Sequence, residues 1–215
     1  MRHEAEIFPP RQKGCMALRR VRGFSLLEMM IVVAITIITT TFALMSVQPA
    51  LKDSRLSNAY NVTLMAMRRA REAAIAERRV YMVTFTAPRT VSITQVITGT
   101  VTFSTTLPTD VAFDAEPGIP STAATTPDGF GTGASSGAID FDVNVGAGGT
   151  NTVYFYPDGS ARDVNNNINN GVLYIARPGD IASSRAITLW GLTGRIRGWR
   201  IYQNAASGTY YWREQ

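Results

Sequence analysis

The sequence contains one cysteine and one histidine among 215 residues, and both lie near its start, at Cys15 and His3. Beyond residue 23 the chain has neither residue, so no disulfide can form there. Most nucleophile–base pairs of enzymes, and most zinc sites, need a thiol or an imidazole. These absences argue against an enzyme and against a bound metal or other cofactor.

Charge is missing from one long stretch, because Phe24–Val47 holds a single charged residue, Glu28. A helix rises about 1.5 Å per residue, so this stretch could cross a hydrocarbon core about 30 Å thick. No charge follows before Lys52, whereas three arginines precede the stretch: Arg19, Arg20 and Arg22. The asymmetry predicts a single-pass protein with a cytoplasmic N-terminus and with everything after residue 50 on the outer side of the membrane.

Glu28 is the anomaly of this stretch, because a charge inside a membrane costs about 2.5–3.5 kcal/mol. One interpretation is that Glu28 lies near the head groups and reaches back to them. The other is that it awaits a cationic partner, as intramembrane charges commonly do.

Gly23, Phe24 and Glu28, followed by the apolar run, resemble the class III signal of type IV pilins and type II secretion pseudopilins. The resemblance implies that a membrane prepilin peptidase cuts between Gly23 and Phe24, and that the new N-terminal Phe24 is methylated. It implies that Glu28 pairs with the N-terminal amine of a neighbouring pilin in a filament. The subunit would wait in inner-membrane lipid before assembly, with its C-terminal domain in the periplasm.

Other kinds of membrane signal fit less well. A secretory signal would be cut after the apolar run at small residues, and Gln48-Pro49-Ala50 is a poor site. A lipoprotein needs its cysteine after the run, but Cys15 precedes it. A plain signal anchor explains the topology and leaves Gly23 and Glu28 unexplained.

Residues 1–23 are then a leader peptide, for which Met16 is an alternative start. The leader holds six of the 21 Lys and Arg and two of the 16 Asp and Glu, so the rest of the chain has a net charge of +1. The high isoelectric point is therefore mostly a property of the leader and does not indicate an anionic partner.

The helical pattern of residues 24–48 continues over residues 49–79 as an amphipathic helix, which Pro49 is expected to kink or interrupt. The apolar stripe consists of Leu56, Tyr60, Leu64, Met67, Ala74 and Ile75. Five arginines fall largely off this stripe, where they either solvate the helix or contact phospholipid or nucleic acid: Arg68, Arg69, Arg71, Arg78 and Arg79.

Residues 80–215 are expected to form one β-rich globular domain, because the hydrophobic period changes from 3.6 to 2. A helix followed by antiparallel strands is an α+β order, which agrees with a pilin-like fold. Residues 108–137 are rich in Pro, Gly, Ser and Thr and predict a long irregular loop. The predicted strands are 80–86, 90–98, 101–105, 138–145, 152–156, 172–176, 186–190 and 195–202.

Motifs in the C-terminal half narrow the resemblance from pilins and pseudopilins in general to one branch of them. The turn Tyr154–Ser160 and the late strands around Ala186–Leu189 and Gly194–Arg197 resemble the GspH/FimT branch of minor pseudopilins.

Gly194-Arg195-Ile196-Arg197 is also similar to a motif of DNA-capturing minor pilins in natural transformation. In a strand, Arg195 and Arg197 share a face at about 6.5–7 Å, while Arg200 lies on the other face. Nearby Trp and Tyr residues could stack on bases, so these three arginines are candidate DNA-binding residues. Alternatively, they solvate a sheet face or dock against an acidic subunit.

Two acidic patterns predict a turn and a strand face rather than functional sites. Asp163–Asn167 resembles part of a calcium loop but lacks its glycine and glutamate, so an Asn-rich turn fits better. Asp140 and Asp142 share a strand face, but the sequence offers no histidine to act with them, so they predict no acid–base chemistry.

Overall fold

The structure is a computed structural model that describes residues 23–131, 137–142 and 150–215. Predictions for the rest of the leader and for the turn at 146–149 lie outside the described residues. The chain divides into two compact units, Met1–Ser46 and Val47–Gln215. The described elements are α1 (Leu26–Glu77), η1 (Pro127–Gly129), β1 (Tyr81–Thr86), β2 (Thr90–Gln95), β3 (Thr100–Thr106), β4 (Ile139–Phe141), β5 (Thr152–Phe155), β6 (Ala161–Arg162), β7 (Gly171–Arg177), β8 (Asp180–Trp190), β9 (Arg195–Gln203) and β10 (Tyr210–Glu214).

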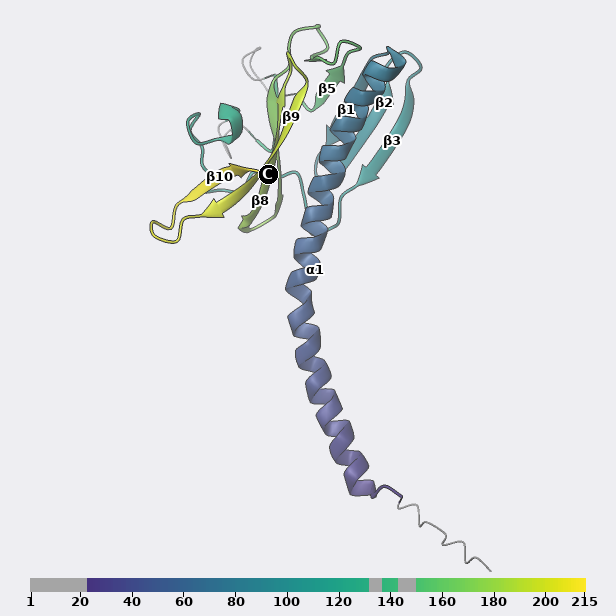
Figure 1. The fold of residues 1–215 in the computed structure, drawn as a ribbon, viewed down its shortest axis with the longest axis vertical. Helices are drawn as coiled ribbons and strands as arrows, with labels where there is room; N and C mark the ends of the chain where they lie inside the picture. The colour runs from purple at the N-terminus through teal and green to yellow at the C-terminus, as the bar shows by residue number, and fades with distance from the viewer. Residues whose placement is uncertain (1–22, 132–136, 143–149) are drawn as a thin grey trace, which may run out of the picture. The chain divides into compact units, whose positions relative to one another are not determined.

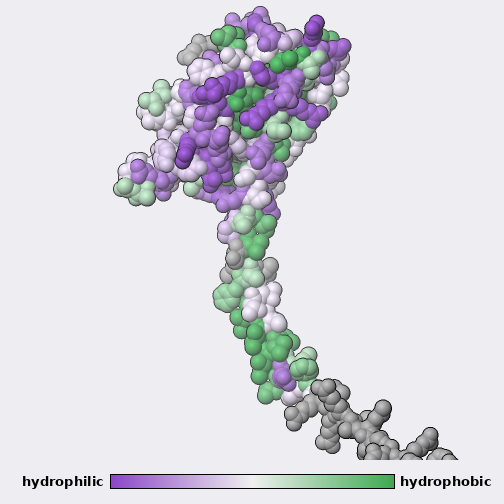
Figure 2. All heavy atoms as spheres, in the orientation of Figure 1, coloured by the Kyte–Doolittle hydropathy of each residue, from purple (hydrophilic) through white to green (hydrophobic). Residues whose placement is uncertain are grey.

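The first unit contains the start of α1. Every side chain from Gly23 to Ala43 is exposed, and Figure 2 shows apolar residues along this segment. Among the described residues, α1 is the one helix that is long and apolar enough to cross a membrane. The helix continues through Pro49, so the predicted interruption does not occur.

In the second unit, α1 packs through a stripe of large and small residues. Leu56, Tyr60 and Met67 are buried as predicted, and Leu64 is partly buried. Ile75 was expected on this stripe but is 43% exposed. Four alanines allow the strands to approach closely: Ala59, Ala66, Ala70 and Ala74.

The strands form two five-stranded antiparallel sheets, β3-β2-β1-β5-β6 and β10-β9-β8-β7-β4. Figure 1 shows β1, β2 and β3 beside the second half of α1. The main core joins α1 to both sheets, with Phe85, Ile93, Phe155 and Ile187 among its buried side chains. The α+β, pilin-like prediction is confirmed, although two sheets rather than one carry it.

Strand β7 of the second sheet is buried on both faces, which a simple alternating pattern does not predict. Residues 172–176 of β7 are all buried. Their outer side packs against the long segment predicted as a loop, through Ile119 and Phe130. Glu116 helps to hold this segment, because its carboxylate accepts a hydrogen bond of 2.7 Å from the Gly179 amide. Burial raises the pKa of Glu116.

The eight predicted strands are all present with shifted ends. Of the predicted strand 138–145, β4 contains Ile139–Phe141, and Asp142 adopts a φ of +68°, whereas residues 143–145 lie outside the described residues. Two strands were not predicted, β6 and β10. β6 has only two residues, and β10 is recognisable only by its pairing with β9.

Candidate functional site: the N-terminal helix and the arginine strands

The first candidate site is the start of α1. Ser25 immediately precedes the helix, and its carbonyl accepts the Met29 amide at 3.1 Å. Serine is a preferred residue at this position because it can satisfy free helix amides. Glu28 lies in the first turn, where the helix dipole favours a negative charge. Phe24 is 75% exposed and Glu28 is exposed, so the predicted cleavage site and the glutamate both lie on an uncovered segment.

Four threonines interrupt the apolar run, and each bonds within the helix. Thr36 donates to the Val33 carbonyl at 2.8 Å, and Thr40 donates to the Thr36 carbonyl at 2.6 Å. Thr39 and Thr41 make equivalent bonds. A hydroxyl satisfied in this way costs little in a medium without water. The segment therefore suits lipid or a helix bundle despite its polar residues.

The second candidate site is the turn between β8 and β9. Gly194 adopts a φ of +61°, and a Cβ there would lie 1.9 Å from the Gly159 carbonyl oxygen and 2.6 Å from Nε of Arg71. Arg71 donates to the carbonyls of Gly159 and Thr193, each at 3.1 Å. The glycine of the Gly-Arg-x-Arg pattern therefore has a packing role, since it lets Arg71 tie the helix to two turns.

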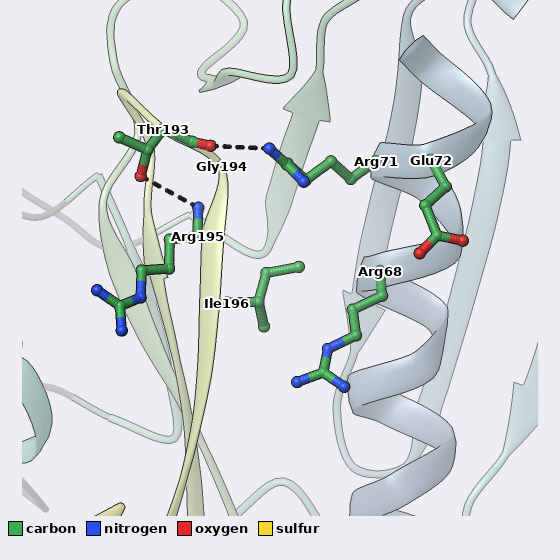
Figure 3. Close-up of a pocket in the computed structure, with 7 residues that line it drawn as sticks. All are labelled: Arg68, Arg71, Glu72, Thr193, Gly194, Arg195 and Ile196. Carbon is green, nitrogen blue, oxygen red and sulfur yellow. Dashed lines mark hydrogen bonds between the residues drawn. The ribbon is translucent and has the colours of Figure 1, made fainter. Parts of the chain in front are cut away.

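A cleft of about 320 Å³ lies at this turn. Figure 3 shows Arg68 and Arg71 extending from α1 toward the start of β9, with Glu72 beside them on the helix. Ile196 points toward the helix, while the exposed guanidinium of Arg195 lies on the opposite side of the strand (Figure 3). Residues of β9 therefore alternate between two faces, as predicted. The guanidinium of Arg195 lies on the face away from Arg68 and Arg71.

Arg197 is held by acidic groups of the protein itself. Its Nη1 donates to Asp128 at 2.7 Å, and its Nε lies 3.4 Å from Glu214. The Asp128 side chain is only 5% exposed and also accepts a hydrogen bond from the Thr188 hydroxyl. The indole of Trp199 donates to that hydroxyl at 3.0 Å. The network attaches the long segment to the second sheet and balances the charge of Arg197.

Arg200 belongs to a row of arginines that the sequence did not reveal. It pairs with Arg185 on β8 and with Arg213 on β10, so the three side chains share one face of the sheet. The next pair along the strands is Tyr202 and Tyr211, whose rings stack at 6.0 Å. The row becomes visible only when the register of three strands is known, because its members are 13 to 28 residues apart.

The arginine row has no acidic partner among the described residues, since none of its members lies within ion-pair distance of a carboxylate. Arg185 is 7% exposed, and burial followed by the charge of Arg200 lowers its pKa. Like charges on directly paired residues destabilise a sheet. The row therefore favours an anionic ligand.

The acidic residues of the two patterns at 163–167 and 140–142 form hydrogen bonds with other residues of the chain. Asp163 accepts the Asn167 amide at 2.7 Å and its side-chain amide at 2.9 Å, so the Asn-rich turn binds its own carboxylate. Asp142 is buried, which raises its pKa, and its amide donates to Asn169 at 2.8 Å. Within the described ranges, no group of three or more metal-ligating side chains is present.

Comparison with known families bears on the first site. A family model for the prokaryotic N-terminal methylation motif matches residues 18–44. The chain carries a class III prepilin signal. This signal implies processing by prepilin peptidase and assembly with other pilins, and with the apolar helix it fits inner-membrane anchoring. It supports a precursor like those of type IV pilins and pseudopilins, and it suggests a structural subunit. The searches of curated proteins and of solved structures found no match.

Replacement of Gly194 tests the packing role. Gly194→Ala is expected to lower the free energy of unfolding by about 1–3 kcal/mol more than Gly208→Ala, because the added methyl group overpacks the contact with Arg71. Gly208 is the matched control, since its φ is +69° and no atom lies within 4 Å of its Cβ position. Urea unfolding followed by tryptophan fluorescence measures both. Equal losses for the two variants would show that only backbone conformation matters at Gly194.

Proposed function

We propose that the protein is a minor subunit of a type IV pilus or a type II secretion pseudopilus, of the GspH/FimT branch. The observation that carries the proposal is the prepilin signal at residues 18–44, together with the apolar helix segment that is exposed from Leu26 to Ala43. An exposed surface of this kind is stable only in lipid or against other helices. The subunit first spans the inner membrane once, with its N-terminus in the cytoplasm and residues 80–215 in the periplasm.

Assembly then follows from cleavage. Prepilin peptidase cuts between Gly23 and Phe24, and the amine of Phe24 is methylated. In the filament, Glu28 pairs with the amine of a neighbouring subunit, which removes two unpaired charges from an apolar bundle. The pair also sets the axial register of the two helices.

The mass of the isolated N-terminal peptide tests this sequence of events. Protein purified from membranes of a cell with a prepilin peptidase is expected to begin at Phe24 and to weigh one methyl group more than the bare peptide. A peptide that retains residues 1–23 would overturn the proposal. An unmethylated Phe24 would overturn only the methylation step.

A second candidate function is DNA binding during natural transformation, which the arginine row favours. Arg200 and Arg213 lie on adjacent strands, about 5 Å apart, beside the stacked tyrosines, whereas the third member of the row, Arg185, is buried. Spaced cations and exposed rings suit a phosphate backbone and its bases. Arg195 adds an exposed charge on the other face, whereas Arg197 is already paired.

Mobility shifts with the full chain in detergent test the second candidate. Arg200→Gln/Arg213→Gln is expected to weaken DNA binding about tenfold and to reduce the salt slope by about 2, or roughly 1 for each arginine. Arg78→Gln/Arg79→Gln is the matched control, because it removes two exposed charges elsewhere. Equal losses in the two variants would show a non-specific charge effect and reject the row as the site.

A further inference from the structure

The edge strand β3 is open. It has β2 on one side and, among the described residues, no strand on the other. Its seven residues include no charge, proline or glycine. Charges and prolines are the usual protection of exposed edges, and β3 has instead a bulge near Val101. Beyond the bulge, Phe103–Thr106 pair regularly with β2 and leave a straight edge.

A groove lies beside this edge. It has a volume of about 340 Å³ and runs between α1 and β3, with Phe103 on one wall. Val62 and Met65 contribute apolar surface from α1, and Met65 is 61% exposed. The guanidinium of Arg69 lies 5.7 Å from the centre of the Phe103 ring and has no carboxylate within ion-pair distance in the described chain. The groove therefore suits an aromatic side chain, which offers apolar surface and a ring face for the arginine.

The same chain has a strand that offers both an open edge and an exposed aromatic side chain. β10 is the edge of the other sheet, and of the remaining described edges β4 has three residues and β6 has two. Near the middle of β10 lies Tyr211, whose side chain is 46% exposed. A strand added to β3 would gain backbone hydrogen bonds, and its alternate side chains would enter the groove.

We propose that β10 of a second copy of this chain pairs with the β3 edge, with Tyr211 in the groove beside Met65 and Arg69. Because β3 and β10 are different edges, the contact is heterologous, and a pair of copies keeps one β3 edge and one β10 edge free. The inference rests on the proposed function, for which it supplies a contact between globular units. A paired β10 has Tyr211 covered, so DNA binding through the arginine row is confined to a copy whose β10 is free.

Cysteine cross-linking tests the contact in the full chain, with Cys15→Ser as background. One copy carries Thr105→Cys on the groove side of β3. The co-expressed copy carries Thr209→Cys or Arg213→Cys in turn, because each position lies two residues from Tyr211, and alternate residues of an extended chain share a face. Mild oxidation of membranes and filaments is expected to give a band of twice the subunit mass for at least one pair.

Two controls decide the result. Ser104→Lys in the first copy is expected to reduce that band at least tenfold, because it places a charge on the open edge. A second copy with Thr122→Cys, an exposed loop position, is expected to give no band. No band from correctly trimmed protein, a band insensitive to Ser104→Lys, or a bond only to a different protein would overturn the inference. Untrimmed protein would overturn the proposed function instead.

Discussion

Gly23→Ile is expected to leave the protein as an uncut precursor in the membrane, with less than about one hundredth of it trimmed. A peptidase that binds the chain around a glycine has no room for a branched side chain, and misplacement by about 1 Å costs on the order of 10²-fold in rate. The substitution does not disturb the fold, because no atom lies within 4 Å of the Cβ position of Gly23. Immunoblotting of membrane fractions separates the precursor from the trimmed form.

The graded control is Gly23→Ala, which adds only one methyl group and is expected to slow cleavage without abolishing it. Normal trimming of Gly23→Ile would remove the peptidase assignment. Unfolding of the second unit by Gly23→Ile would contradict the structure, in which no described residue lies within 4 Å of the Cβ position of Gly23.

Glu28→Ala is expected to be inserted and trimmed normally but to enter filaments about 100-fold less. The estimate follows from about 2.5–3.5 kcal/mol for an uncompensated intramembrane charge, here the neighbour's amine, at about 1.4 kcal/mol per tenfold. Alanine makes the helix more apolar, so failed membrane insertion cannot explain the loss. The measurement is the ratio of subunit in sheared filaments to subunit in membranes.

Two variants control for this effect. Glu28→Gln keeps the shape without the charge and should assemble as poorly as Glu28→Ala. Glu72→Ala removes an exposed acid from the second half of α1 and should assemble normally. Wild-type amounts of filament from Glu28→Ala would refute the pairing role.

Most of the periodic structure was predictable from the residues. The apolar run predicted the first half of α1. In the second half, the three- and four-residue spacing of Leu56, Tyr60 and Met67 identified the buried face, because apolar residues at this spacing lie on one side of a helix. The pattern misplaced Ile75, which is 43% exposed, because Ala70 and Ala74 occupy the buried face of this part of α1. It also missed β10, since five residues without an apolar alternation become a strand only beside β9.

The arginine site was predictable in part. Spacing placed Arg195 and Arg197 on one face and Arg200 on the other, as the alternation of a strand requires. Spacing could not show that Asp128, 69 residues earlier, neutralises Arg197. Nor could it bring Arg185 and Arg213 to Arg200, because strand register depends on tertiary pairing.

The sequence by itself determined the signal, the apolar helix and the α+β order, because each depends on neighbouring residues and on their preference for water or oil. The tertiary structure decided which cations are free and which edges are open. Asp128 reaches Arg197 only when the long segment folds over the second sheet. β3 and β10 become edges only when the order of the strands is set. Both outcomes depend on contacts between residues far apart in the chain, which no local pattern encodes.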